Sequence, residues 1–282
     1  MLGKDIAEVF SGNYDVYCTD LRITREGEKN IVGDLTDEAF IDKLLVEVQP
    51  DLIIHCAAIV NVNLCEQNKA LCENVHINAT KYLAQYKKAK IVYISTDSVF
   101  DGVKGNFSET DQTAPQNYYA KTKLLGESAV LANPSSLIVR TNIYGFNKPA
   151  GKSLAEWALG ELNSGKQVNG FSDVYFNPLY TRQLARIIKD LIDSGKEGIF
   201  HAASTAKLSK FEFVRSIAKA FDLSEKNVSS ALIDEVFEGA KRPKNSSLSI
   251  AKLTPYVKNK KDLSIEEGLK EFARDYKKVF GE

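Results

Sequence analysis

Residues 90–96 read KIVYIST, and DSVFDG follows at 97–102. An unbroken apolar run of this length is typical of a strand that is buried on both faces of a parallel sheet. The runs DLIIHCAA (51–58) and SSLIVRT (135–141) have the same character, and segments of helical periodicity cover 36–48 and 117–132. Strands that alternate with helices in this way predict an α/β fold, a doubly wound parallel sheet with helices on both faces.

The alternation begins with a short predicted strand at 14–20 and includes a long helical segment that ends near residue 89. After residue 145 it loosens, with helices expected over 153–164, 181–193, 209–221 and 263–279 and a strand over 198–203. We therefore predict a dinucleotide-binding domain over 1–145. Residues 146–282 are expected to form a smaller, partly helical lobe, with some segments returning to the main sheet.

Composition excludes several classes of protein. The 282 residues carry 37 Lys and Arg against 37 Asp and Glu, so net charge gives no reason to expect nucleic acid as a partner. No stretch approaches the roughly 20 apolar residues of a membrane span, and no signal-like segment opens the chain, so we expect a cytoplasmic protein. We interpret the four cysteines as reduced thiols in the core, and the absence of CxxC and HxxxH pairs predicts no metal site.

Ligands of open parallel sheets bind beyond the carboxyl ends of the strands. Thr96 ends one predicted strand and precedes Asp97, and 23 residues later Tyr119 and Lys123 lie four apart at the start of a predicted helix capped by Asn117. A nearby ammonium favours the phenolate and lowers the pKa of a tyrosine, which makes the phenol a better proton donor. Tyr118 with Lys121, three apart, is a competing pair by spacing alone.

STDSVFDG, PQNYYAKTKLLGE (115–127) and VRTNIYG (139–145) together resemble the extended short-chain dehydrogenase/reductase superfamily, and within it the dTDP-4-dehydrorhamnose reductase group. The resemblance continues through GDLTD (33–37), HCAAIVNVNLCE (55–66), FSDVYFNPLYTRQLA (171–185) and RPKNSSL (242–248), so it covers nearly the whole chain. It implies a Rossmann-like domain, a substrate-binding lobe and reduction of the C4 ketone of a nucleotide-linked 6-deoxy sugar.

The resemblance also implies roles for individual residues. Tyr119 is the general acid, Lys123 its electrostatic partner and a ribose contact, and Thr96 the donor to the carbonyl oxygen. The expected cofactor contacts are Gly3, Asp20, Arg22, Asp34, Leu35, Ala57, Ala58, Tyr119, Lys123 and Thr141. The expected substrate contacts are Thr96, Asp97, Asn142, Asn177 and Arg242, with Arg242 on a diphosphate.

The cofactor is expected to be NADP or NAD. Asp20 suits the ribose hydroxyls of NAD, whereas Arg22 or Arg25 could bind the 2′-phosphate of NADP. The chain opens with Met1-Leu2-Gly3, so the first strand and most of the glycine-rich turn of this fold are absent from it. Either the natural product begins upstream of Met1 or this chain binds its cofactor poorly. A third possibility is structural: the sheet closes the gap left by the first strand, and the strands on either side of that gap pair directly.

His76 stands where this group places an asparagine, and we expect a helix-face residue there. Two other departures bear on the substrate. Ser98 stands where an aromatic residue is common, and the loop at 171–178 differs from that of the rhamnose-type enzymes. The alternative functions are a nucleotide-sugar epimerase or dehydratase, and a non-catalytic regulatory subunit that binds a nucleotide sugar or NADP. The chain could also form a homodimer.

Overall fold

The computed structural model describes residues 1–22, 29–149, 151 and 153–281. At its centre lies a parallel sheet in the order β10 (Gly198–Ala202), β5 (Ser136–Thr141), β4 (Lys90–Thr96) and β3 (Leu52–His55). Each neighbouring pair is parallel, and Thr96 lies opposite Thr141 at the carboxyl ends of β4 and β5. The predicted parallel sheet is confirmed.

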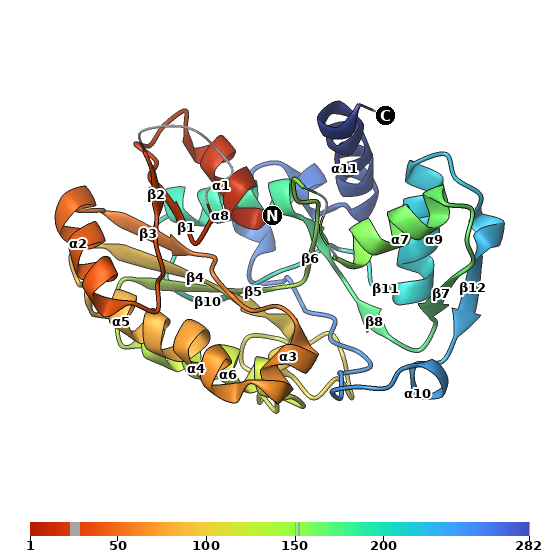
Figure 1. Cartoon of the computed structure of the whole chain (residues 1–282), viewed down its shortest axis with the longest axis horizontal. Helices are drawn as coiled ribbons and strands as arrows, with labels where there is room; N and C mark the ends of the chain where they lie inside the picture. The colour runs from red at the N-terminus through yellow and green to blue at the C-terminus, as the bar shows by residue number, and fades with distance from the viewer. Residues whose placement is uncertain (23–28, 150, 152, 282) are drawn as a thin grey trace.

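Helices cover both faces of the sheet (Figure 1). On β4, Ile91 and Tyr93 pack toward α2 (Glu38–Val48), α5 (Ala79–Gln85) and α6 (Tyr118–Leu131). Val92, between them, packs toward α1 (Leu2–Phe10) and α8 (Thr181–Asp193) on the opposite face. Successive strand residues point to opposite faces, so a continuous apolar run is what a strand covered on both sides requires.

The strands β1 (Cys18–Asp20) and β2 (Asn30–Val32) form a separate parallel pair. In the part of the chain that the structure describes, β1 does not pair with β3. The structural alternative considered above, in which these two strands pair directly, is therefore not what the described residues adopt. Helix α1 instead packs beside α8 and contributes Leu2, Ile6 and Phe10 to the core on that face of the sheet.

The smaller lobe has its own core, built on α7 (Leu154–Asn163), α9 (Lys210–Ala220) and α11 (Ile265–Phe280). Two parallel strands, β7 (Val168–Phe171) and β12 (Val228–Ala231), lie beside α9 at the far end of the lobe (Figure 1). Helix α8 packs on the main sheet and β10 forms its edge strand, although both follow residue 145.

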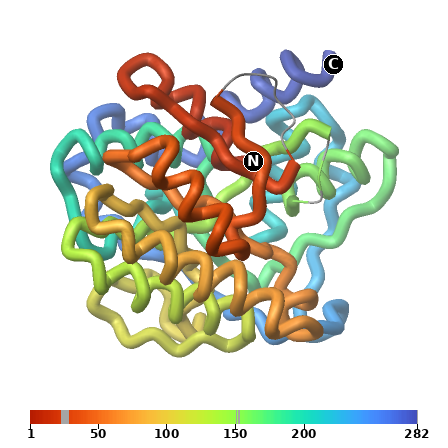
Figure 2. Tube along the Cα trace, turned by 60° about the vertical axis from the view of Figure 1, so that its left-hand side comes forward, coloured from red at the N-terminus to blue at the C-terminus, as the bar shows by residue number. Residues whose placement is uncertain are grey.

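In the lobe and just before it lie short strands that periodicity did not predict, because each is only two residues long. They are β6 (Ile143–Tyr144), β8 (Tyr175–Phe176), β9 (Leu179–Tyr180) and β11 (Leu208–Ser209). A short helix, α10 (Ile233–Val236), follows β12. The α1 and α11 helices lie at the same end of the molecule (Figure 2), where Arg182 faces both Asp5 and Asp275.

Three predictions of local structure need correction. The strand expected at 14–20 begins only at Cys18. The strand expected at 51–58 ends at His55, where the chain leaves the sheet. The helical segment expected to reach residue 89 is divided into α3 (Val62–Gln67), α4 (Lys69–Glu73), a π-helical turn (Asn74–Asn78) and α5. Asn68 causes one break, since its side chain caps α4. Among the described residues, no helix is long and apolar enough to cross a membrane.

Candidate active site

Helix α6 carries the predicted catalytic pair. Asn117 caps it as expected, with its Oδ1 accepting a hydrogen bond from the Ala120 amide at 2.9 Å. Tyr119 and Lys123 follow on one helix face. At Gly126 a Cβ atom would lie 2.3 Å from the Tyr93 hydroxyl oxygen and 2.6 Å from the His76 carbonyl oxygen, so only glycine lets α6 approach the sheet this closely.

Tyr119 meets Thr96 at the carboxyl end of β4. A hydrogen bond from the Thr96 side chain favours the Tyr119 phenolate, but burial has the larger effect and raises the pKa of Tyr119 to about 12. The negative charge of Asp97 acts in the same direction as burial. The prediction that Lys123 lowers the pKa of Tyr119 is therefore wrong for this state of the protein, in which the phenol stays protonated at neutral pH.

Lys123 is almost completely buried, with 2% of its surface exposed. Its Nζ lies 4.0 Å from the centre of the Tyr93 ring. Burial lowers the pKa of Lys123 to about 7, while the Glu127 carboxylate one helical turn away opposes that shift. Among the described residues, no group accepts a hydrogen bond from the Lys123 amine. A bound molecule with a hydrogen-bond acceptor at this position would satisfy the buried amine.

Asp97 holds the strand ends together. Its Oδ2 accepts hydrogen bonds from Asn142 Nδ2 at 2.9 Å and from Ser246 Oγ at 2.5 Å. Its Oδ1 accepts from the hydroxyls of Thr96 at 3.2 Å and Ser98 at 3.3 Å. The predicted substrate residues Asp97 and Asn142 are thus brought together, and the carboxylate connects the ends of β4 and β5 with the loop around Ser246.

His76 connects the catalytic helix with the loop after β3. Its Nε2 accepts a hydrogen bond from the Ile59 amide at 2.8 Å, so this nitrogen carries no proton. Its Nδ1 lies 2.8 Å from Thr122 Oγ1, and the Thr122 hydroxyl in turn donates to the Tyr119 carbonyl oxygen at 2.9 Å. Burial lowers the pKa of His76 to about 3, which keeps the ring neutral. His76 is therefore a fully buried residue of the π-helical turn, and its ring positions Thr122 and the loop after β3.

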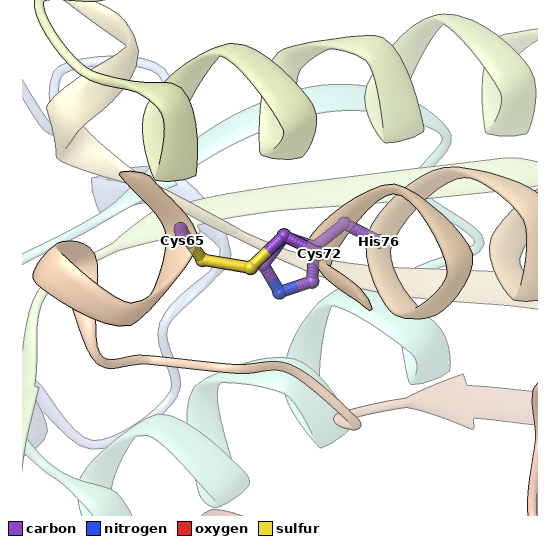
Figure 3. A group of neighbouring side chains, drawn as sticks. All are labelled: Cys65, Cys72 and His76. Carbon is purple, nitrogen blue, oxygen red and sulfur yellow. A yellow bond between two sulfur atoms is a disulfide. The ribbon is translucent and has the colours of Figure 1, made fainter. Parts of the chain in front are cut away.

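Cys65 and Cys72 form a disulfide that joins α3 to α4, next to the His76 ring (Figure 3). The prediction that all four cysteines are reduced is therefore wrong for these two, while Cys18 and Cys56 are not part of a disulfide. One ligand atom from each of Cys65, Cys72 and His76 lies within 4.8 Å of the others. With both sulfurs bonded to each other and both ring nitrogens hydrogen-bonded, these three side chains do not form a metal site.

The predicted cofactor contacts follow the carboxyl ends of their strands. Asp20 ends β1, and its Oδ1 accepts from the Arg22 amide at 3.2 Å. Asp34 follows β2 and accepts from both the amide and the hydroxyl of Thr36 at 2.8 Å. Ala57 and Ala58 follow β3, and Thr141 ends β5.

Two other predicted cofactor positions differ in their surroundings, and a third lies outside the described residues. Leu35 packs against the core beside α2. Gly3 lies in the first turn of α1, and a Cβ there would contact nothing within 4 Å, so packing inside the chain does not require a glycine. Arg25 lies outside the described residues.

The two predicted substrate residues of the smaller lobe have different surroundings. Asn177 Nδ2 donates to the Ser204 and Leu248 carbonyl oxygens, and its Oδ1 accepts from the Leu248 amide at 2.9 Å. Its amide hydrogens are both used within the chain, which gives Asn177 a role in positioning the loop. Its direct contact with substrate stays a prediction. Arg242 lies on the surface, with its guanidinium 4.8 Å from the centre of the Phe237 ring.

Sequence reasoning missed Lys210 and Ser246. Lys210 is the first residue of α9 and lies close enough to Asp97 and Arg242 to feel both charges. The capping box between Ser209 and Glu212 is visible in the sequence and would have located this helix start. The Ser246 contact with Asp97 joins residues 149 positions apart, and nothing local signals it.

The parallel sheet, the Thr96–Tyr119 contact and the buried Lys123 define a Rossmann-type oxidoreductase of the extended short-chain dehydrogenase/reductase superfamily. The chain belongs to the RmlD substrate binding domain family, whose model matches residues 1–278. The resemblance inferred from the sequence is therefore confirmed.

Individual relatives support this assignment. The chain is 32% identical over 238 residues to a dTDP-4-dehydrorhamnose reductase of Mycobacterium tuberculosis, covering 79% of this chain and 77% of the relative. It is 30% identical over 266 residues to methionine adenosyltransferase 2 subunit beta of Pongo abelii, covering 90% and 78%. A crystal structure of dTDP-4-dehydrorhamnose reductase from Bacillus anthracis in complex with NADP superposes with a TM-score of 0.85 at 27% identity, covering 97% and 95%.

Proposed function

We propose that this protein uses NADPH to reduce the C4 ketone of a nucleotide-linked 6-deoxy sugar, with dTDP-4-dehydrorhamnose as the first candidate substrate. The observation that carries the proposal is the contact of Tyr119 with Thr96, beside the buried Lys123, at the carboxyl edge of the sheet. The reductases of M. tuberculosis and B. anthracis, and the NADP in the latter, support both the reaction and the cofactor.

The residues at this edge fit a dinucleotide. Lys123 offers a buried ammonium without an internal acceptor, which suits the ribose hydroxyls. Asp20 and Arg22 adjoin at the end of β1, where the adenosine ribose and a 2′-phosphate would be held. The alanines after β3 leave room for the cofactor to approach the backbone. When bound, NADPH supplies the hydride for the reduction.

The chain's own groups supply the proton and hold the ketone. The phenol of Tyr119 is protonated at neutral pH, as a proton donor must be. Thr96 has one hydroxyl hydrogen, which Asp97 or the Tyr119 oxygen accepts in this structure and which the substrate oxygen would accept during reduction. Proton transfer from Tyr119 then leaves a phenolate that a charged Lys123 stabilises.

The alternative functions receive less support from the site. A dehydratase needs an acidic group free to act on the sugar, whereas the Asp97 carboxylate already accepts four hydrogen bonds and is followed by Ser98. The similarity to a methionine adenosyltransferase subunit supports the alternative of a non-catalytic regulatory subunit. Against that reading, Thr96, Tyr119 and Lys123 are all present and placed together.

The direct test is turnover of dTDP-4-dehydrorhamnose, followed by the loss of NADPH absorbance, with NADH in parallel. We expect oxidation of NADPH in step with formation of the 4-hydroxy sugar, and much slower oxidation with Tyr119→Phe. NADPH binding without turnover of this or any related nucleotide-linked ketone would overturn the proposal in favour of a regulatory subunit.

The location and assembly of the protein stay part of the proposal. A reductase that draws on soluble NADPH and nucleotide sugars suits the cytoplasm. The Cys65–Cys72 disulfide stands against that location, because disulfides are rare in cytosolic proteins. A homodimer stays a prediction.

A further inference from the structure

Lys210 is the first residue of α9, and hydrogen bonds hold its backbone against neighbouring segments. Its backbone amide donates to the Val174 carbonyl oxygen at 2.8 Å, just before β8. The preceding strand β11 pairs with β8, with Ser209 opposite Tyr175. The Ser209–Glu212 capping box then fixes the first turn of α9. The backbone from which the Lys210 side chain extends is therefore fixed by β8 before it and by the capping box of α9 after it.

The position is an unfavourable one for a cation. A helix N-terminus repels positive charge, and Lys210 is the first residue of α9. The side chain is half-buried, with Nζ 3.2 Å from the centre of the Phe176 ring, and its amine has no hydrogen-bond acceptor within the described ranges. Residues placed against such local preferences are expected at functional sites.

Arg242 approaches from the other side of β8. The Tyr175 amide donates to the Lys244 carbonyl oxygen at 2.7 Å, and the Ser246 amide donates to the Tyr175 carbonyl oxygen at 3.0 Å, so the 242–246 segment runs along this strand. Arg242 is close enough to Lys210 for its charge to lower the pKa of that amine.

Asp97, whose charge acts on Lys210, does not pair with it. The carboxylate of Asp97 attracts the ammonium, but its hydrogen bonds go to Ser246, Asn142, Thr96 and Ser98. Two cations therefore flank β8 with no acid bonded to either among the described residues. A doubly charged anion would relieve their mutual repulsion.

We propose that Lys210, together with Arg242, binds the diphosphate of the nucleotide-linked substrate. This inference rests on the proposed function, which supplies the class of ligand, and adds Lys210 as the residue that selects for a charged nucleotide. The sugar attached to the diphosphate would then extend toward Thr96, because Asp97 connects Thr96 with the loop that carries Ser246.

Binding should also take up a proton. Burial lowers the pKa of Lys210 to about 7, so the amine is largely neutral above that pH. An anion bound against the amine favours its charged form and raises its pKa. At about pH 8, wild-type protein should therefore take up a fraction of a proton per ligand bound.

The test is calorimetric titration of the full chain with dTDP and with thymidine, in two buffers of different ionisation enthalpy. Lys210→Met keeps the length of the side chain without its charge, and we expect it to weaken dTDP binding about tenfold or more and to abolish proton uptake. Thymidine affinity should not change. Lys210→Arg should retain more of the dTDP affinity than Lys210→Met. Lys207→Met is the matched control, because Lys207 also lies over a ring, that of Tyr175, but is exposed.

The outcomes separate this inference from the proposed function. Equal dTDP affinity in Lys210→Met and wild type would overturn the inference, even if the wild type reduces its ketone substrate. Weaker dTDP binding in Lys210→Met without turnover of any nucleotide-linked ketone would support the inference and refute the proposed reduction. Absence of dTDP binding by the wild type would overturn the inference. NADPH affinity of Lys210→Met equal to wild type shows that the variant is folded.

Discussion

The Glu127 carboxylate and the Arg140 guanidinium form an ion pair in the interior, with 2.7 Å between Glu127 Oε2 and Arg140 Nη2. Neither side chain is more than 4% exposed. Ser95 Oγ donates to the other carboxylate oxygen at 2.5 Å. The pair joins α6 to β4 and β5 one helical turn beyond Lys123, so it supports the helix that carries the catalytic groups.

Glu127→Gln should destabilise the protein strongly. It removes the charge that compensates a buried guanidinium, and breaking such a pair costs about 3–5 kcal/mol of the free energy of unfolding. The double variant Glu127→Gln with Arg140→Met should recover part of this loss, because no uncompensated charge remains. Urea denaturation of the three proteins measures the difference. A loss below about 1 kcal/mol in the single variant would show that the pair does not stabilise the fold.

The Cys65–Cys72 disulfide predicts how many thiols of the protein react. Thiol titration of the unfolded protein without reductant should find two reactive thiols, those of Cys18 and Cys56, and four after reduction. Four thiols in the unreduced protein would show that the bond is absent.

Removal of that disulfide should lower stability without removing a catalytic group. Closing a loop of this length in the unfolded chain is worth about 2 kcal/mol, so the double variant Cys65→Ser, Cys72→Ser should lose roughly that much free energy of unfolding. The comparison with reduced wild type controls for the added hydroxyls. A double variant as stable as the oxidised wild type would mean that the bond does not constrain the unfolded chain.

Tyr119→Phe should reduce kcat about 10²–10⁴-fold, because general acid catalysis contributes in that range. The affinity for NADPH should change little. Tyr118→Phe is the matched control, since Tyr118 is the neighbouring phenol and bonds to Glu73 at the surface instead of to Thr96. Stopped-flow single turnover with each variant separates chemistry from product release. Comparable losses in the two variants would remove Tyr119 from its assigned role.

The sequence predicted the parts of the fold that depend on local pattern. The strand at 90–96 and the helix at 181–193 agree with the structure at both ends, because burial on two faces and amphipathic spacing are legible in a short window. It placed Thr96, Tyr119 and Lys123 together because a strand end and a helix start are both local signals.

The remainder depended on contacts between distant segments. The pKa of Tyr119 rises because burial outweighs the hydrogen bond from Thr96, and the extent of burial is not encoded in the spacing of a tyrosine and a lysine. The Ser246–Asp97 bond and the approach of Lys210 to Arg242 are made only when the smaller lobe folds against the sheet. The disulfide was missed because two cysteines seven apart show no sign of the turn between α3 and α4 that brings them together.

Lys123→Met should abolish turnover and yet stabilise the protein. The pKa of Lys123 is about 7 in the folded state and about 10.4 in an unfolded chain, so between these values the unfolded state binds more protons. The free energy of unfolding should therefore rise with pH across that window, and at neutral pH the buried amine costs on the order of a few kcal/mol. Lys123→Met removes this cost and flattens the rise, although Lys210 still contributes a slope of the same sign.

Lys121→Met, on the same helix but exposed, should change neither the free energy of unfolding nor its rise with pH. Denaturation midpoints from about pH 6 to pH 10 measure both, and a Lys123→Met protein less stable than wild type throughout would show that the amine stabilises the fold instead of serving the reaction.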